Sequence, residues 1–251
     1  MKTYGLIGKN IEYSFSKSYF AEKFKSEKLK CEYINFDINK IDDFHIIFDK
    51  IKNLSGLNVT IPYKQSIISK LDNIHKDAKQ IGAVNTIKFS GNKLIGYNTD
   101  HLGFKESITP FLKAEHKNAL ILGTGGAAKA VEFAFKSMNI KTIKATRDPQ
   151  KKGCITYKKL TETVIKNNQI IVNCTPLGTF PKTEMSPKIP YNAIKNYHLL
   201  YDLIYNPELT KFLKFGIKSK ATTINGINML KIQAEKSWEI WNSDFNENII
   251  I

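Results

Sequence analysis

The chain has 251 residues, 42% of them hydrophobic, and a formal net charge of +15. This length allows one large domain or two small ones, and no apolar run is long enough to cross a bilayer. The lysines are scattered rather than gathered in a stripe, which argues against nucleic-acid binding, although a positive field favours an anionic substrate or cofactor.

The three cysteines are widely spaced and form no C-x-x-C pair. This pattern argues against a disulfide framework or a zinc site and favours a reducing compartment. The N-terminus runs directly into a strand-like segment with no signal peptide. We therefore expect a cytoplasmic protein without a resident metal.

The first part of the chain alternates strand and helix patterns. We predict strands at 4–7, 32–38 and 56–60, with helices at 18–30 and 41–54 between them. Pro62 ends the third strand because proline removes a backbone donor and restricts the residue before it. A helix at 66–81, a hairpin with strands at 83–89 and 94–97, and a helix at 101–112 interrupted by Pro110 follow. These patterns predict an α/β layer.

The pattern resets at Asn118 with a strand, a glycine turn and an amphipathic helix. The strand at 119–122 leads into Gly123-Thr124-Gly125-Gly126-Ala127-Ala128, and the helix at 127–138 has apolar residues at 3–4 spacing. In this order the first glycine makes the tight turn, the second lets the backbone approach a pyrophosphate, and Ala128 lets the helix pack on the strand. The stretch therefore favours dinucleotide binding.

Further alternating elements follow the glycine turn. We predict strands at 142–146, 170–173, 198–204 and 221–224, helices near 158–166 and at 208–215, and a last helix at 227–241. Such alternation predicts a parallel, doubly wound sheet of Rossmann type. We expect two α/β domains with ligands bound in a cleft between them; the pattern does not explain the C-terminal Ile249-Ile250-Ile251.

The end of the second strand of this half indicates which dinucleotide binds. An acidic residue there holds the ribose hydroxyl of NAD, whereas an arginine accommodates the 2′-phosphate of NADP. Arg147, the one arginine of the chain, follows this strand, and its planar fork suits phosphate. Thr146 adds a hydroxyl and Lys151 a second positive charge. Asp148 leaves NAD open, but the pattern favours NADP.

Two side chains are candidates for proton transfer to a ketone oxygen. Lys64 follows the strand that Pro62 ends, although a solvated lysine is the commoner interpretation of such a position. Asp100 follows the second hairpin strand, where an aspartate is more often a helix N-cap. Neither residue is convincing alone.

Longer residue strings resemble the shikimate dehydrogenase family, an NADP-dependent group of aromatic-pathway enzymes. They are Gly56-x-Asn58-Val59-Thr60-x-Pro62-x-Lys64, Gly82-Ala83-Val84-Asn85-Thr86 and Gly96-x-Asn98-Thr99-Asp100-x-x-Gly103. Shorter matches are Ser14-x-Ser16, the glycine turn, Asp202-x-x-Tyr205 and Met229-Leu230-x-x-Gln233. The resemblance extends from Tyr4 to about Trp241.

The resemblance implies a two-domain fold and an activity. Residues 1–101 and 227–251 would form the substrate domain, to which the last helix returns, and 102–226 the Rossmann NADP-binding domain. The activity would be reversible reduction of 3-dehydroshikimate to shikimate by NADPH in aromatic amino acid biosynthesis. Lys64 would be the acid–base residue and Asp100 would tune it.

The resemblance also implies the binding residues. The substrate carboxylate would bind Ser14, Ser16 and Tyr205, and the ring hydroxyls would bind Thr60, Asn85 and Gln233. The pyrophosphate would bind Gly123, Thr124, Gly125, Gly126 and Ala127, the 2′-phosphate Thr146, Arg147 and Lys151, and the nicotinamide half Thr175, Leu203 and Gly226. Here Thr146-Arg147-Asp148 replaces the family's usual Asn-Arg-Thr.

Two alternatives remain at this point. One is a quinate/shikimate dehydrogenase that uses NAD, and the other is a catalytically silent cofactor-binding homologue, against which the presence of both Lys64 and Asp100 argues. We expect a small-molecule substrate, no nucleic-acid or membrane partner, and a monomer or homodimer. We also expect the cleft to close around its ligands.

Overall fold

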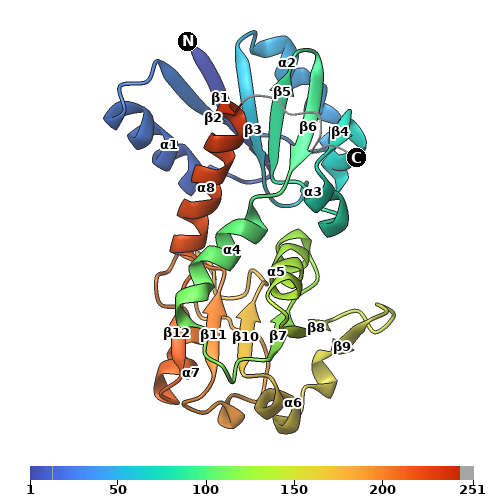
Figure 1. Cartoon of the computed structure of the whole chain (residues 1–251), viewed down its shortest axis with the longest axis vertical. Coiled ribbons are helices and arrows are strands. Elements are labelled where there is room, and N and C mark those ends of the chain that lie inside the picture. The colour runs from blue at the N-terminus through green and yellow to red at the C-terminus, as the bar shows by residue number, and fades with distance from the viewer. Residues whose placement is uncertain (13, 244–251) are drawn as a thin grey trace. The chain divides into compact units, whose positions relative to one another are not determined.

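A computed structural model describes residues 1–12 and 14–243 of the chain (Figure 1). The C-terminal Ile249-Ile250-Ile251 and Tyr13 lie outside the described residues. The chain divides into two compact units. Unit 1 comprises Met1–Thr99 together with the chain from Gln233 onward, and unit 2 comprises Asp100–Ile232. The boundary between the units falls inside the last helix, α8 (Ile227–Asn242).

Unit 1 is built on a mixed sheet with the strand order β2-β1-β3-β5-β6-β4. β1 is parallel to β2 and β3, whereas β5 is antiparallel to both β3 and β6. The elements are β1 (Lys2–Gly8), α1 (Phe15–Ser26), β2 (Cys31–Asp37), α2 (Ile46–Lys50), β3 (Leu54–Val59), β4 (Asn73–Ile74), α3 (Lys76–Ile81), β5 (Thr86–Ser90) and β6 (Lys93–Tyr97), with 3₁₀ helices at Ile41–His45 and Ser66–Lys70.

Aromatic side chains join α8 to the sheet of unit 1. Tyr4, Phe20 and Phe24 pack with Trp241 in one buried cluster. Gly56 of β3 lies directly against the indole of Trp241, so that a Cβ at this position would come within 2.5 Å of the ring. The first glycine of the Gly56-to-Lys64 string is therefore required by packing.

The continuous helix predicted at 66–81 is wrong. The segment forms a 3₁₀ helix, the two-residue strand β4 and the short helix α3. Asp72 interrupts the helix because its backbone amide donates to Leu94 O at 3.0 Å and its Oδ2 accepts from Leu94 N at 2.7 Å. The segment therefore pairs with β6 of the hairpin through a contact that the periodicity of its own sequence does not show.

Unit 2 is built on a sheet with the order β12-β11-β10-β7-β8-β9, in which every neighbouring pair is parallel. The order reverses at β7, as in a doubly wound Rossmann-type sheet, which confirms the predicted fold class. The elements are α4 (Asp100–Ile108), a 3₁₀ turn at Thr109–Phe111, β7 (Asn118–Leu122), α5 (Gly126–Ser137), β8 (Lys141–Thr146), β9 (Cys154–Thr156), α6 (Glu162–Asn167), β10 (Ile170–Asn173), β11 (Leu199–Asp202), α7 (Lys211–Lys218) and β12 (Thr222–Ile224).

Both faces of this sheet are buried. Ile121, Val172 and Tyr201 belong to the hydrophobic core on one face, whereas Leu120 and Ile171 belong to the core on the other. Strands covered on both sides have near-continuous apolar sequences, which is why they are recognisable in the chain. No helix in the described ranges is both long and apolar enough to span a membrane.

A buried carboxylate fixes the ends of β10 and β11. Asp202 has no exposed surface, and it accepts hydrogen bonds from Asn173 Nδ2 at 3.0 Å, Thr210 Oγ1 at 2.7 Å and Ile204 N at 3.1 Å. Thr210 also caps α7 by accepting from Leu213 N. The helix therefore begins at Lys211 and ends at Lys218, three residues later than the predicted 208–215.

The packing of Gly56 against Trp241 predicts a strong coupling between these two positions. Gly56→Ala should lower the free energy of unfolding by about 1–3 kcal/mol, because the added methyl group overpacks a full site. In a Trp241→Leu background the same substitution should cost clearly less. Urea unfolding of the four proteins in this double-mutant cycle measures the coupling, and a coupling near zero would contradict the packing argument.

The Asp202 carboxyl predicts a pH dependence of stability. Burial raises its pKa from 3.8 to about 7, against the hydrogen bonds from Thr210, Ile204 and Asn173 that lower it. Between these two pH values the folded chain holds a proton that the unfolded chain has released. This contribution to stability is therefore complete below the unfolded pKa and is lost as the pH rises through about 7.

Asp202→Asn cannot titrate, so it should lack this dependence. The free energy of unfolding of the wild type should fall relative to the variant by roughly 4 kcal/mol across that range, at 1.36 kcal/mol per pKa unit. Urea unfolding of both proteins at a series of pH values measures the difference. A difference that stays constant with pH would contradict the assignment to Asp202.

Candidate active site

Lys64 lies in the loop after β3, and hydrogen bonds on two sides hold this loop. Thr60 N donates to Ile7 O of β1 at 2.8 Å, and Lys64 O accepts from Val84 N at 2.7 Å. The Ile61–Pro62 peptide bond within the loop is cis. The Lys64 and Thr60 side chains are both half-buried. The loop backbone, and with it the position of Lys64, is therefore fixed by β1 and by the residues that precede β5.

Asn85 and Gln233 lie together, although 148 positions separate them in the chain. Asn85 Oδ1 accepts from Thr99 N at 2.7 Å, and its Nδ2 donates to Thr99 Oγ1 at 2.9 Å and to Gln233 Oε1 at 3.2 Å. Because a backbone amide can only donate, the contact with Thr99 N fixes the orientation of the Asn85 amide. Both side chains are buried.

Ser14 and Ser16 lie at the N-terminus of α1. Ser14 is the N-cap, and its Oγ accepts from Ser16 N at 3.2 Å. A helix N-terminus carries partial positive charge, so hydroxyl groups placed there suit an anionic group such as a carboxylate. Ser14 is half-buried and Ser16 is buried.

The other predicted catalytic and carboxylate-binding residues belong to unit 2. Asp100 is the first residue of α4 and is 4% exposed. Tyr205 follows β11 and is half-buried. Lys64 belongs to unit 1, so the pairing of Lys64 with Asp100 stays a prediction.

The glycine turn after β7 has the geometry of a phosphate cradle. Gly123 has φ +117°, and a Cβ there would meet Cys174 O at 3.2 Å, so any other residue would be strained at this position. Gly125 is the N-cap of α5 and offers the helix no side-chain cap, and a Cβ added to it would meet nothing within 4 Å. Open space at an uncapped helix N-terminus fits a pyrophosphate. Ala128 packs in the core, while Thr124 of the turn and Gly126 and Ala127 at the start of α5 are half-buried.

The turn after β8 separates the roles of Arg147 and Asp148. Thr146 Oγ1 accepts from Asp148 N at 3.1 Å, and Asp148 Oδ1 accepts from Gln150 N at 2.9 Å. The Asp148 carboxylate, which made NAD binding conceivable from the sequence, therefore stabilises a local turn. Arg147 and Lys151 are exposed beside it, as contact with a ribose 2′-phosphate requires.

Lys129 of α5 adds to the positive charge near this turn, and sequence analysis missed it. Burial, and then the charges of Lys151 and Lys144, lower the pKa of Lys129. Lys144 forms an ion pair with Glu132 at 2.6 Å. In the sequence, Lys129 could have been recognised by its position one helical turn after Gly125, the second glycine of the turn.

The three residues predicted at the nicotinamide lie after three neighbouring strands of unit 2. Thr175 Oγ1 donates to Asn173 Oδ1 at 2.7 Å, at the end of β10. Leu203 follows β11, and Gly226 follows β12. Gly226 packs so closely against Leu203 that a Cβ added to it would lie 2.1 Å from Leu203 O. Carboxyl ends of parallel strands share one edge, which is where doubly wound sheets bind ligands.

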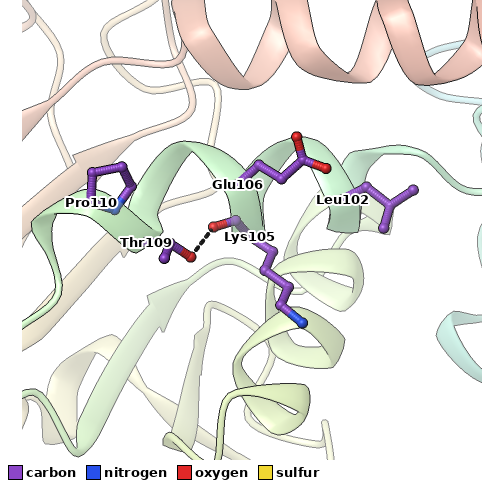
Figure 2. Close-up of a pocket in the computed structure, with 5 residues that line it drawn as sticks. All are labelled: Leu102, Lys105, Glu106, Thr109 and Pro110. Atoms are coloured by element: carbon purple, nitrogen blue, oxygen red, sulfur yellow. Dashed lines mark hydrogen bonds between the residues drawn. The ribbon is translucent and has the colours of Figure 1, made fainter.

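A shallow hollow lies along α4 and the turn that follows it (Figure 2). It has a volume of about 390 Å³ and contains none of the predicted site residues. Figure 2 shows Lys105 and Glu106 on opposite sides of the helix, so their charges do not converge on one ligand. Its lining is Leu102, Lys105, Glu106, Thr109 and Pro110.

Comparison with known proteins identifies the family. The family model of the shikimate dehydrogenase substrate binding domain matches residues 6–87. The shikimate dehydrogenase (NADP(+)) of Methanococcus maripaludis is 40% identical over 96% of this chain and 91% of its own length. Among solved structures, shikimate dehydrogenase 1 of Peptoclostridium difficile has 37% identity and a TM-score of 0.83, covering 99% of this chain and 95% of that one. A shikimate dehydrogenase in complex with NADP+ has 33% identity and a TM-score of 0.85, covering 99% and 93%. This similarity along nearly the whole length shows that the chain belongs to the shikimate dehydrogenase family.

Proposed function

We propose that the chain is an NADP+-dependent shikimate dehydrogenase, an oxidoreductase that interconverts shikimate and 3-dehydroshikimate in aromatic amino acid biosynthesis. The observation that carries the proposal is the match along 96% of the chain to a protein named shikimate dehydrogenase (NADP(+)). The phosphate cradle of unit 2 and the buried polar side chains of unit 1 support it, because a hydride transfer between a cofactor and a polyhydroxy acid needs both.

The reaction adds one hydride and one proton to a ketone. NADPH, held by the residues proposed in unit 2, would supply the hydride for the carbonyl carbon. The Lys64 ammonium donates its proton to the carbonyl oxygen as negative charge develops there. In the oxidation of shikimate the neutral Lys64 amine takes this proton back. Asp100 would hydrogen-bond the same region of the substrate and assist Lys64.

The polar residues of unit 1 would recognise the substrate. Ser14 and Ser16 would donate hydroxyl hydrogen bonds to the shikimate carboxylate, joined by Tyr205. Asn85 and Gln233, with Thr60, would bind the ring hydroxyls. Because Asn85 and Gln233 are buried, a hydrogen bond to a ring hydroxyl would discriminate against an analogue that lacks that hydroxyl.

The turn after β8 supports NADP over NAD. Asp148 Oδ1 accepts from Gln150 N, whereas Arg147 is exposed after the second strand of this sheet half, where an arginine would accommodate a ribose 2′-phosphate. A quinate/shikimate dehydrogenase that uses NAD is the alternative that cofactor preference tests. The predicted cytoplasmic location, the absence of a nucleic-acid partner and the monomeric or homodimeric state stay predictions.

The role of Lys64 predicts a large loss of rate in Lys64→Met. Loss of a general acid–base group should lower kcat by about 10²- to 10⁴-fold, with little change in the KM for NADP+. The measurement is the absorbance of NADPH formed from NADP+ and shikimate. Lys70→Met is the matched control, because Lys70 forms an ion pair with Asp42 in the same unit. A folded wild type that binds NADP+ but does not oxidise shikimate would refute the proposed function.

The role of Arg147 predicts a change in cofactor preference. Arg147→Gln should raise the KM for NADP+ by about 10- to 100-fold, since a hydrogen bond to a charged group contributes about 1.5–3 kcal/mol, and should leave the KM for NAD+ unchanged. Lys152→Gln removes the same charge from an exposed neighbour and controls for the general field. Equal effects of the two variants would count against a specific phosphate contact.

A further inference from the structure

Ser237 of α8 lies at the centre of a buried hydrogen-bonded network in unit 1. The side chain has no exposed surface. Its Oγ lies 2.9 Å from Asn58 Nδ2, 2.8 Å from Thr86 Oγ1 and 3.2 Å from Thr99 Oγ1. These partners come from β3, β5 and the residue before α4, so one hydroxyl joins four segments of the chain.

The hydrogen-bonding capacity of this hydroxyl is fully used. Ser237 Oγ donates to Gln233 O one helical turn earlier, at 2.9 Å. Its two lone pairs are then left for Asn58 Nδ2 and for a threonine hydroxyl. The group is therefore fixed in place.

One branch of the network ends at two predicted substrate residues. Thr99 Oγ1, which lies next to Ser237, also accepts from Asn85 Nδ2 at 2.9 Å. The same Asn85 nitrogen donates to Gln233 Oε1 at 3.2 Å. The position of Ser237 therefore bears on both amide side chains, through Thr99 and through the turn of α8 that carries Gln233.

The other branch ends at a third predicted substrate residue. Asn58 Oδ1 accepts from the Tyr33 hydroxyl at 2.8 Å. Burial raises the pKa of Tyr33, and the nearby Ser16 side chain opposes that rise. Buried atoms thus connect the residue predicted at the substrate carboxylate with those predicted at the ring hydroxyls.

We propose that Ser237 is a positioning residue of the shikimate site, which holds Asn85, Gln233 and Ser16 in one arrangement without touching the substrate. The inference rests on the proposed function. Without the hydroxyl, Asn58 Nδ2 and the neighbouring threonines lose a buried partner and must reorient. A small displacement of binding groups is enough to weaken an oriented site. The residues proposed for NADP+ all belong to unit 2.

The test compares Ser237→Ala with Ser107→Ala. Ser107 is a buried helical serine of unit 2 whose Oγ lies 2.7 Å from the Tyr201 hydroxyl and donates to Phe104 O. Both variants lose the same buried group. Ser237→Ala should raise the KM for shikimate about tenfold, with the KM for NADP+ within about twofold of wild type, whereas Ser107→Ala should leave the KM for shikimate unchanged.

Tyr33→Phe keeps the test decisive if Ser237→Ala does not fold. This variant retains the ring, which stacks on Phe20 at a centroid distance of 4.7 Å, and removes only the hydroxyl at the far end of the network. It should raise the KM for shikimate about threefold to tenfold, again without affecting NADP+.

The outcomes separate this inference from the proposed function. A selective rise in the KM for shikimate supports the positioning role. An unchanged KM, or equal changes for shikimate and NADP+, overturns it while the wild-type activity stands. A wild type that binds NADP+ but neither binds nor oxidises shikimate overturns the proposed function and the inference together.

Discussion

In each unit a buried asparagine amide ties a strand end to another segment, and predicted binding residues lie at both contacts. Asn85 Oδ1 accepts from Thr99 N at 2.7 Å in unit 1. In unit 2 Asn173 Oδ1 accepts from Thr175 N at 3.0 Å, and its Nδ2 donates to Asp202 at 3.0 Å. An unpaired buried amide costs about 1–3 kcal/mol, so these contacts persist. The backbone at Thr99 and at Thr175 is thereby held in place.

The fold was predictable where the local pattern was strong. The strand, glycine turn and helix predicted from Asn118 onward are confirmed as β7 and α5. They were recognisable because a strand that is buried on both faces of a sheet has a near-continuous apolar sequence. β4 and β9 are too short for any period to show. The break at Asp72 and the start of α7 after Thr210 depend on Leu94 and Asp202 respectively. Such contacts are decided by tertiary structure, which overrides local propensity.

The candidate site divides in the same way. The glycine turn and Arg147 are recognisable because their neighbours in sequence are also their neighbours in space. The environment of Ser237 is invisible in the sequence, since its partner Asn58 lies 179 positions away. A buried serine in a helix has no distinctive pattern, and only its contacts with three other segments show what it holds. Lys129 was missed because its significance lies in the lysines of the neighbouring strand and turn.

At the proposed cofactor site, selectivity for a phosphate would follow from the electrostatic field of the protein as well as from direct contacts with Arg147. Lys144 and Lys151 repel the charge of Lys129 and, after burial, contribute to lowering its pKa. A 2′-phosphate relieves this repulsion, whereas a ribose hydroxyl does not. Salt screens exposed charges over about 8 Å at physiological ionic strength but acts less on partly buried ones. The half-buried Lys129 should therefore keep its effect under conditions that weaken the exposed Arg147. The local arrangement of Lys129, Lys144 and Lys151, and not the total charge of +15, would therefore favour a phosphate at the proposed cofactor site.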